Sequence, residues 1–178
     1  PPQARAAMMR RSSAAALAAL ALSGAVLGMS STAAAPAAPA DLRMADVDGG
    51  HVAYRVLGHG RPALVLISGL GNDMGSFAKV APALAAKATV IVYDRAGYGA
   101  SSPSSGPTAA AAAERELSAV LRASGVEGPY VIAGHSLGGL YAEYFAARHP
   151  DQVAGLILEE SRPADFTHRC EAAKLAMC

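Results

Sequence analysis

A serine in a glycine-rich turn is the residue of this 178-residue chain best suited to nucleophilic chemistry. Ser136 lies between Gly134 and Gly138, after the apolar run 130–133 and before the segment 140–148, which has helical spacing. In a strand–turn–helix arrangement of this kind, the serine hydroxyl stands clear of the sheet, and side chains two positions away on either side would collide. The pattern predicts a nucleophile elbow in which Ser136 attacks an acyl carbon.

The elements that must position this serine alternate along the chain. Asp48-Gly49-Gly50 is a hairpin signal between the first two expected strands, and short apolar runs then alternate with segments of helical spacing. This alternation predicts an α/β fold with a doubly wound, mostly parallel sheet. The expected strands are 42–47, 51–57, 63–67, 88–93, 130–133 and 153–158, and the last four are expected to be buried. The expected helices are 77–87, 108–124 with Thr108 as its cap and Gly125 at its end, and 140–148.

Polar and glycine-rich segments follow the expected parallel strands. Because functional groups in such sheets gather at the carboxyl ends of the strands, we expect these segments to meet at one edge. They contain Gly69, Asp94, Ser136, Glu159 and Glu160. Asp94 and Arg95 are interpreted as structural residues that hold the loop after their strand.

The first 40 residues are typical of an export leader. Arg10-Arg11 precede an apolar run from Ala14 to about Leu27, and cleavage options with small residues follow between Ala33 and Ala40. The run is too short to span a bilayer comfortably, so no stable membrane span is expected once the leader is removed. We expect a secreted or periplasmic protein; an Ala-rich buried helix is the alternative interpretation.

The composition allows a folded core and argues against a nucleic-acid partner. Hydrophobic residues make up 52% of the chain and charged residues 16%, so the chain can bury a core. The formal net charge is only +1, and three arginines lie in the leader. No basic surface for nucleic acid is expected, and the expected partner is a small-molecule acyl substrate. Metal binding is not expected, because no His/Cys ligand spacing occurs.

Four segments together resemble the α/β-hydrolase fold superfamily of serine hydrolases, over about residues 52–163. They are similar to the oxyanion loop, the D-R-x-G-x-G-x-S loop, the commonest elbow and the segment after the elbow helix of that family. These segments are 66–71, 93–101, 134–139 and 149–158.

The resemblance implies roles for several residues. Ser136 would be the nucleophile, and the backbone N–H groups of Leu70 and Leu137 would hold the oxyanion. Gly134 and Gly138 would be structural. Where the family usually has His-Gly in the oxyanion loop, this chain has Ser68-Gly69. The substitution keeps the backbone donor and changes the neighbouring hydrogen bonds. The mechanism implied by the family needs no cofactor.

An acid and a base must complete the site, because a serine hydroxyl alone is a weak nucleophile. Glu159 and Glu160 end the strand after the elbow and either could be the acid; each could equally be a strand-end carboxylate with no catalytic role. In the family the order is serine, acid, histidine. His168 is the only histidine after the acid candidates, and it lies where such enzymes begin their lid. His135 should point away from the site, and His149 should be remote from it.

The domain is expected to span 41–178 as the N-terminal portion of a hydrolase, with 161–178 as the start of a lid. The sheet would then have an exposed parallel edge. Cys170 and Cys178 would lie about 12 Å apart on a helix, too far for a disulfide unless the helix unwinds.

Three functions stay open. The first is an exported serine hydrolase that cleaves carboxylic esters through an acyl-enzyme on Ser136. The second is a different acyl-transfer reaction at the same site, as in an aminopeptidase, amidase or acyltransferase. The third is a truncated or degenerate protein that keeps the elbow without catalysis.

Overall fold

The computed structural model describes residues 41–104, 109–163, 165–166 and 172. Several predictions fall outside these residues and stay untested. They concern the leader 1–40, the cap Thr108, the candidate base His168, and Cys170 with Cys178.

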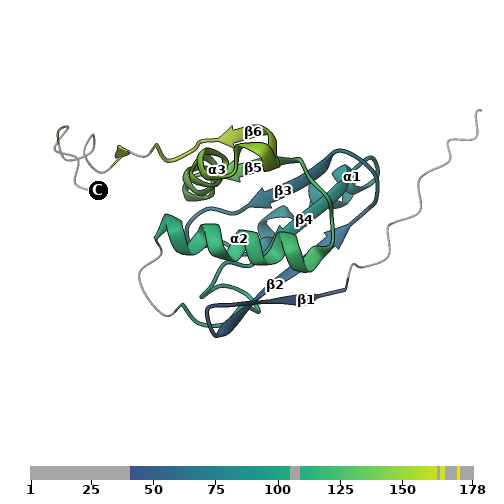
Figure 1. Cartoon of the computed structure of the whole chain (residues 1–178), viewed down its shortest axis with the longest axis horizontal. Helices are drawn as coiled ribbons and strands as arrows, with labels where there is room; N and C mark the ends of the chain where they lie inside the picture. Colours follow the sequence, from purple (N-terminus) through teal and green to yellow (C-terminus); the bar gives the residue numbers. More distant parts are fainter. Residues whose placement is uncertain (1–40, 105–108, 164, 167–171, 173–178) are drawn as a thin grey trace, which may run out of the picture. The chain divides into compact units, whose positions relative to one another are not determined.

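One twisted sheet organises the described chain (Figure 1). Its six described strands are β1 (Arg43–Val47), β2 (Gly50–Leu57), β3 (Ala63–Ile67), β4 (Thr89–Tyr93), β5 (Tyr130–His135) and β6 (Val153–Glu159). Their order is β1-β2-β4-β3-β5-β6. The β1–β2 and β2–β4 pairs are antiparallel, and the other three pairs are parallel. This arrangement confirms the predicted mostly parallel sheet.

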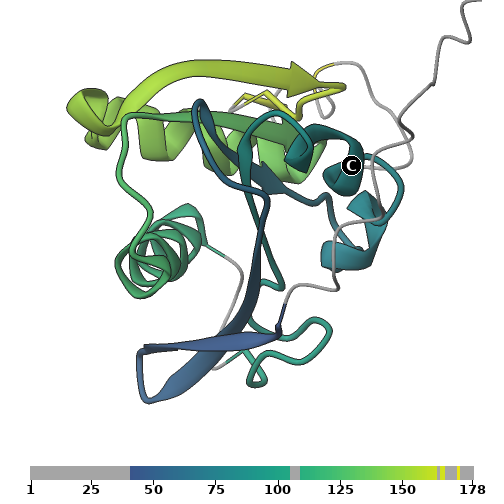
Figure 2. The ribbon, with the colours of Figure 1, turned by 90° about the vertical axis from the view of Figure 1, so that its right-hand side faces the viewer.

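Helices cover both faces of the sheet, as Figure 2 shows. In the described chain they are α1 (Ala81–Ala85), α2 (Ala110–Ser124) and α3 (Leu137–Arg148), with the short 3₁₀ turns η1 (Met74–Phe77) and η2 (Pro150–Gln152). Apolar residues of α2 and α3 pack in one core cluster, and those of α1 in a second. The sheet is therefore doubly wound. None of the helices in the described ranges is long and apolar enough to cross a bilayer.

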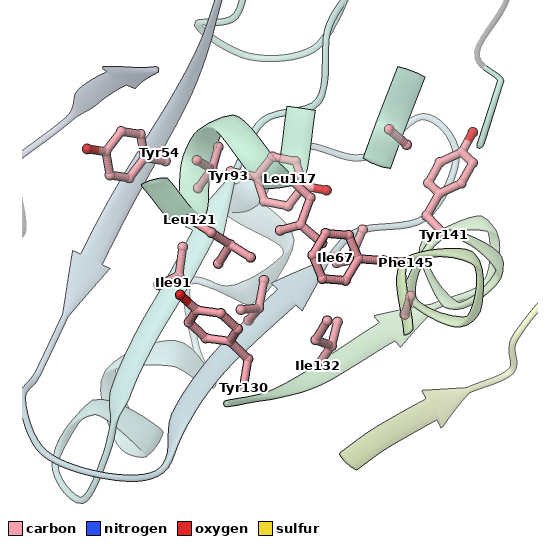
Figure 3. Close-up of a cluster of buried hydrophobic side chains, with 14 of the residues drawn as sticks. Tyr54, Ile67, Ile91, Tyr93, Leu117, Leu121, Tyr130, Ile132, Tyr141 and Phe145 are labelled. Carbon is pink, nitrogen blue, oxygen red and sulfur yellow. The ribbon is translucent and has the colours of Figure 1, made fainter. Parts of the chain in front are cut away.

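The alternation of side chains along β3 divides the apolar residues between the two clusters. Val65 and Ile67 belong to the cluster under α2 and α3, whereas Leu64 and Leu66 belong to the cluster under α1. Figure 3 shows Ile67 beside Leu117 of α2 and Phe145 of α3. A strand buried on both faces has a continuous apolar sequence, which is why β3 was predicted with its correct bounds.

The helix predicted over 77–87 was wrong in length, because the structure divides this segment. η1 ends at Phe77, and α1 begins only at Ala81. Pro82 is in the first turn of α1, where its missing N–H costs nothing, whereas a helix that continued through this position would lose a hydrogen bond. For α2, the N-cap is Ala109, without a side-chain cap, and Gly125 ends the helix at a φ of 68° as predicted.

The prediction that β6 is buried was also wrong. β6 lies at the end of the strand order and pairs with β5 on one side. Leu156, Ile157 and Leu158 are consequently exposed, with Ile157 at 56%. A continuous apolar run does not distinguish a central strand from one at the sheet edge, but the expected exposed parallel edge is present in the described structure.

Replacing Leu117 with alanine should destabilise the domain. Leu117 is 1% exposed in the core under α2, so Leu117→Ala should lower the free energy of unfolding by about 2–5 kcal/mol, through lost burial and an unfilled cavity. Urea denaturation measures this change. Leu42→Ala is the matched control, because Leu42 is 42% exposed, and its loss should stay within about 0.5 kcal/mol. Equal effects of the two substitutions would contradict the core assignment.

Candidate functional site

Ser136 adopts a strained backbone conformation between β5 and α3. Its φ is 52° and its ψ is −119°, a combination that L-residues rarely adopt. Its N–H donates to the Glu159 carbonyl at 3.0 Å, and its carbonyl accepts from the N–H groups of Gly139 at 3.0 Å and Arg162 at 2.9 Å. Backbone bonds on both sides therefore hold the serine in this conformation.

The two flanking glycines are required by close backbone approach. A Cβ on Gly134 would lie 2.5 Å from the Gly138 carbonyl oxygen, and a Cβ on Gly138 would come closer than 3.0 Å to the carbonyl oxygen of Ile67. Real Cβ atoms do not approach backbone atoms this closely. The first turn of α3 thus lies directly against the end of β3, in the arrangement that the glycine spacing predicted.

The register of the parallel strands brings the remaining predicted segments to the same edge. Ile67 pairs with Gly134, and His135 pairs with Glu159. The residues that follow these pairs, at the carboxyl ends of β3, β5 and β6, therefore meet at one edge of the sheet. A pocket of about 520 Å³ opens there. The loop after β3, η1 and the last residues of β5 and β6 line it, and the lining includes Ser68, Gly69, Asn72, Phe77, His135 and Glu159.

The loop after β3 lies against the serine. A Cβ on Gly69 would be 3.2 Å from the Ser136 Cβ. Within the loop, the Ser68 hydroxyl donates to the Asn72 carbonyl at 2.9 Å. Ser68, which replaces the histidine usual in the family, thus closes its own loop with this bond. The two predicted oxyanion donors differ in surroundings, because Leu137 is buried at the start of α3 and Leu70 is exposed.

The structure does not assemble an acid–base pair at Ser136 within the described residues. Glu159 lines the pocket, and both Glu159 and Glu160 are exposed. Glu160 has a φ of 46°. Which carboxylate could serve as the acid stays a prediction, as does the role of His168.

The side chain of His149 makes its contacts away from Ser136. Its Nε2 lies 2.6 Å from the Glu114 carboxylate, and its ring stacks on Phe145. Ser136 and His149 flank the 12 residues of α3, so they are separated by about 20 Å along the helix axis at 1.5 Å per residue. The prediction that His149 is remote from the serine is confirmed.

Asp94 holds the loop after β4, as the sequence predicted. One carboxylate oxygen accepts the Met74 N–H at 2.7 Å, and the other accepts the Ala100 N–H at 3.0 Å. Asp94 therefore joins its own loop to η1. Arg95 instead reaches the neighbouring loop and donates to the Gly69 carbonyl, a contact that no sequence pattern indicated.

A buried carboxylate beneath this loop was missed by the sequence analysis. Glu116 on α2 is buried beside the predicted apolar stripe, and its carboxylate accepts the Ala96 N–H at 3.2 Å. Burial raises the pKa of Glu116, and the nearby Arg95 opposes that rise. Burial also raises the pKa of Tyr93, whose hydroxyl has no hydrogen-bond partner in the described structure. A glutamate at a helical position otherwise suited to solvent gives no sequence signal of burial.

No cluster of three or more His, Cys, Asp or Glu side chains suited to a metal ion occurs among the residues described here. The polar groups at the edge of the sheet are instead a serine hydroxyl, backbone N–H groups and carboxylates. This set suits nucleophilic acyl chemistry.

The sequence profile described as the alpha/beta hydrolase fold matches residues 62–173. A putative carbamate hydrolase RutD of Azorhizobium caulinodans is 37% identical over 66% of this chain and 44% of its own length. A pimeloyl-[acyl-carrier protein] methyl ester esterase of Chromobacterium violaceum is 40% identical over 60% of this chain and 39% of its own length. The chain thus spans less than half the length of these curated relatives.

A solved structure shows the same similarity. The esterase RhEst1 from Rhodococcus superposes with a TM-score of 0.61 at 34% identity, over 67% of this chain and 46% of that one.

Adding a methyl group at the elbow should disrupt it. Gly138→Ala places a Cβ against the Ile67 carbonyl, so the free energy of unfolding should fall by about 1–3 kcal/mol or more. Gly155→Ala is the matched control, because a Cβ at Gly155 on β6 has nothing within 4 Å. Urea denaturation of both variants tests the prediction, and equal stability of the two would contradict the close approach.

Removing the charge of Glu116 should alter how stability depends on pH. Because the pKa is raised in the folded state, this group stabilises the fold fully below its ordinary value of 4.5, and the contribution is lost as pH rises through the raised pKa. As the pH rises from acid to neutral, the free energy of unfolding of Glu116→Gln should therefore fall by less than that of the wild type. Thermal unfolding across that range measures the difference, with the exposed Glu127→Gln as control. A larger fall of the free energy of unfolding with rising pH in Glu116→Gln than in the wild type would contradict the prediction.

Proposed function

Because this chain belongs to the α/β-hydrolase fold family, we propose that the whole protein is an exported serine hydrolase that cleaves carboxylic esters through an acyl-enzyme on Ser136. The observation that carries the proposal is the elbow. Its strained serine lies at the N-terminus of α3 and against the loop of Gly69. In the proposed site the nucleophile and the oxyanion donors would act on one acyl carbon.

The proposed reaction has two halves. The Ser136 oxygen attacks the ester carbonyl while its proton passes to a base, and the alcohol leaves with a proton. Water then hydrolyses the acyl-enzyme and regenerates the serine. Glu159 or Glu160 is the candidate acid. In the family the basic histidine comes after the last strand, and His168 is the only histidine of this sequence that follows these carboxylates.

The oxyanion would be held by two backbone N–H groups. Leu137 is the first residue of α3, where the N–H is not used by the helix ladder and the dipole favours negative charge. Leu70 follows Gly69, where an added Cβ would lie 3.2 Å from the Ser136 Cβ. Preorganised donors of this kind each contribute about 2.7–4 kcal/mol to transition-state stabilisation.

A second candidate is the hydrolysis of a carbamate or amide at the same site. The similar protein of Azorhizobium caulinodans carries the name of a putative carbamate hydrolase, which favours this candidate. Both reactions use the same nucleophile and oxyanion donors, and the leaving group differs. A substrate panel of matched esters, carbamates and amides separates the two.

Export is proposed from the leader. The basic residues Arg10-Arg11, the apolar run and the small residues up to Ala40 together favour a secreted or periplasmic location. The mass of the mature protein from its native source would test this location, because removal of the leader shortens the chain by about its first 40 residues.

Replacing Ser136 should abolish ester turnover. In the full-length protein, Ser136→Ala should lower kcat for a p-nitrophenyl ester by about 10⁴-fold or more, because no other group replaces the nucleophile. A fluorophosphonate probe should label the wild type on Ser136 and leave the variant unlabelled. Ser118→Ala on α2 is the serine control and should keep full activity. Unchanged turnover in Ser136→Ala would refute the proposal, and a wild type without turnover or labelling would favour a non-catalytic protein.

A further inference from the structure

Arg95 is the most deeply buried charged side chain in the described structure, at 1% exposure. Burying a guanidinium is unfavourable unless compensating groups surround it. Two of its nitrogens, Nε and Nη1, have no hydrogen-bond partner within the described ranges. None of the ion pairs in the described ranges includes Arg95; the Asp94 carboxylate binds two backbone N–H groups, and the buried Glu116 carboxylate interacts electrostatically with the guanidinium without forming one of these pairs. The burial of this cation therefore calls for an explanation.

The guanidinium makes a strong, buried hydrogen bond to the proposed oxyanion loop. Nη2 of Arg95 donates to the carbonyl oxygen of Gly69 at 2.5 Å, and the bond is buried. A hydrogen bond from a cation is shorter and about twice as strong as one between neutral groups. The same carbonyl receives only a weak second bond, from the Asn72 N–H at 3.4 Å. Arg95 is thus the main group that fixes this carbonyl.

The carbonyl of Gly69 and the N–H of Leu70 belong to the same peptide group. The group is planar, and none of the cis bonds of the structure occurs here, so the C=O and the N–H point in opposite directions. Holding the oxygen therefore fixes the direction of the Leu70 N–H. A cation on the oxygen also polarises the group and makes its N–H a better donor.

Tyr98 reinforces this arrangement. Its ring lies over the Arg95 guanidinium at 4.7 Å, and its hydroxyl accepts the Gly71 N–H at 3.2 Å. The ring of Tyr141 on α3 lies 5.5 Å from the same guanidinium. The cation therefore joins the loop after β4, the loop after β3 and the elbow helix.

We propose that Arg95 is a positioning residue for catalysis, which orients and polarises the Gly69–Leu70 peptide so that the Leu70 N–H is aimed at the oxyanion. This inference rests on the proposed function, in which that N–H stabilises the transition state. Because the oxyanion forms only in the transition state, loss of Arg95 should lower kcat and leave KM nearly unchanged.

The first test compares variants of the full-length protein. Arg95→Met keeps the length of the side chain and removes the charge, and it should lower kcat for ester hydrolysis by about 10- to 100-fold, less than the effect of losing an oxyanion donor outright. Arg95→Lys keeps the charge but lacks the planar guanidinium with its several N–H donors. Its kcat should lie between those of Arg95→Met and the wild type. In Arg95→Ala, guanidinium added at millimolar concentration should restore part of kcat, which a purely structural role would not predict.

Arg61→Met is the matched control. Arg61 also donates to a glycine carbonyl, that of Gly128 at 3.0 Å, but this bond is exposed and joins the segments that precede β3 and β5. The kcat of Arg61→Met should equal that of the wild type. A folded Arg95→Met with wild-type kcat, or with a raised KM at constant kcat, would overturn the inference.

A second measurement keeps the inference separate from the proposed function. If the wild type hydrolyses no ester, the proposed function fails. The amide chemical shift of Leu70 in ¹⁵N-labelled full-length protein then decides whether Arg95 fixes the Gly69–Leu70 peptide. A displaced Leu70 resonance in Arg95→Lys, with the control Arg61→Met unchanged, supports the fixed peptide. A Leu70 resonance that is the same in Arg95→Lys and wild type refutes it. Arg95→Lys keeps this test available even where Arg95→Met does not fold.

Discussion

The close contact between the first turn of α3 and the ends of β3 and β5 is the constraint on which the candidate site depends. Gly134 and Gly138 leave no room for a side chain, so the backbone of the elbow lies directly on the Ile67 carbonyl. The pairing of Ile67 with Gly134 fixes the same ends in register. The position of Ser136 relative to the end of β3 is therefore set by backbone contacts.

Much of the fold could be predicted because its signals are local. The strand β3 is a continuous apolar run, the hairpin turn contains Asp48-Gly49-Gly50, and the elbow has its glycines at the required spacing. The predictions that failed had two different causes, one local and one in the arrangement of the sheet. The apolar spacing over 77–87 continues through Pro82, although the helix there is short, and the apolar run of β6 lies at the edge of the sheet and not inside it.

The contacts around the candidate site could not be predicted from the sequence. Arg95 and Gly69 are 26 positions apart, and Arg95 was expected to hold only its own loop. Glu116 is buried beside the apolar stripe of α2, and only the spacing of the apolar residues could be recognised in the sequence. Residue types and spacing identify a nucleophile, but they do not show which loops meet over it. For the same reason the acid and the base stay predictions.

The backbone of Ser136 has a consequence for how this protein can change over time. A non-glycine residue with a φ of 52° and a ψ of −119° costs about 1–3 kcal/mol, and glycine would adopt this conformation with little strain. In a hydrolase, selection for turnover would keep the serine against that gain in stability. A descendant released from catalysis would face no such opposition, and exchange to glycine at this one position would be favoured. The identity of residue 136 in a lineage would then record whether catalysis is still under selection.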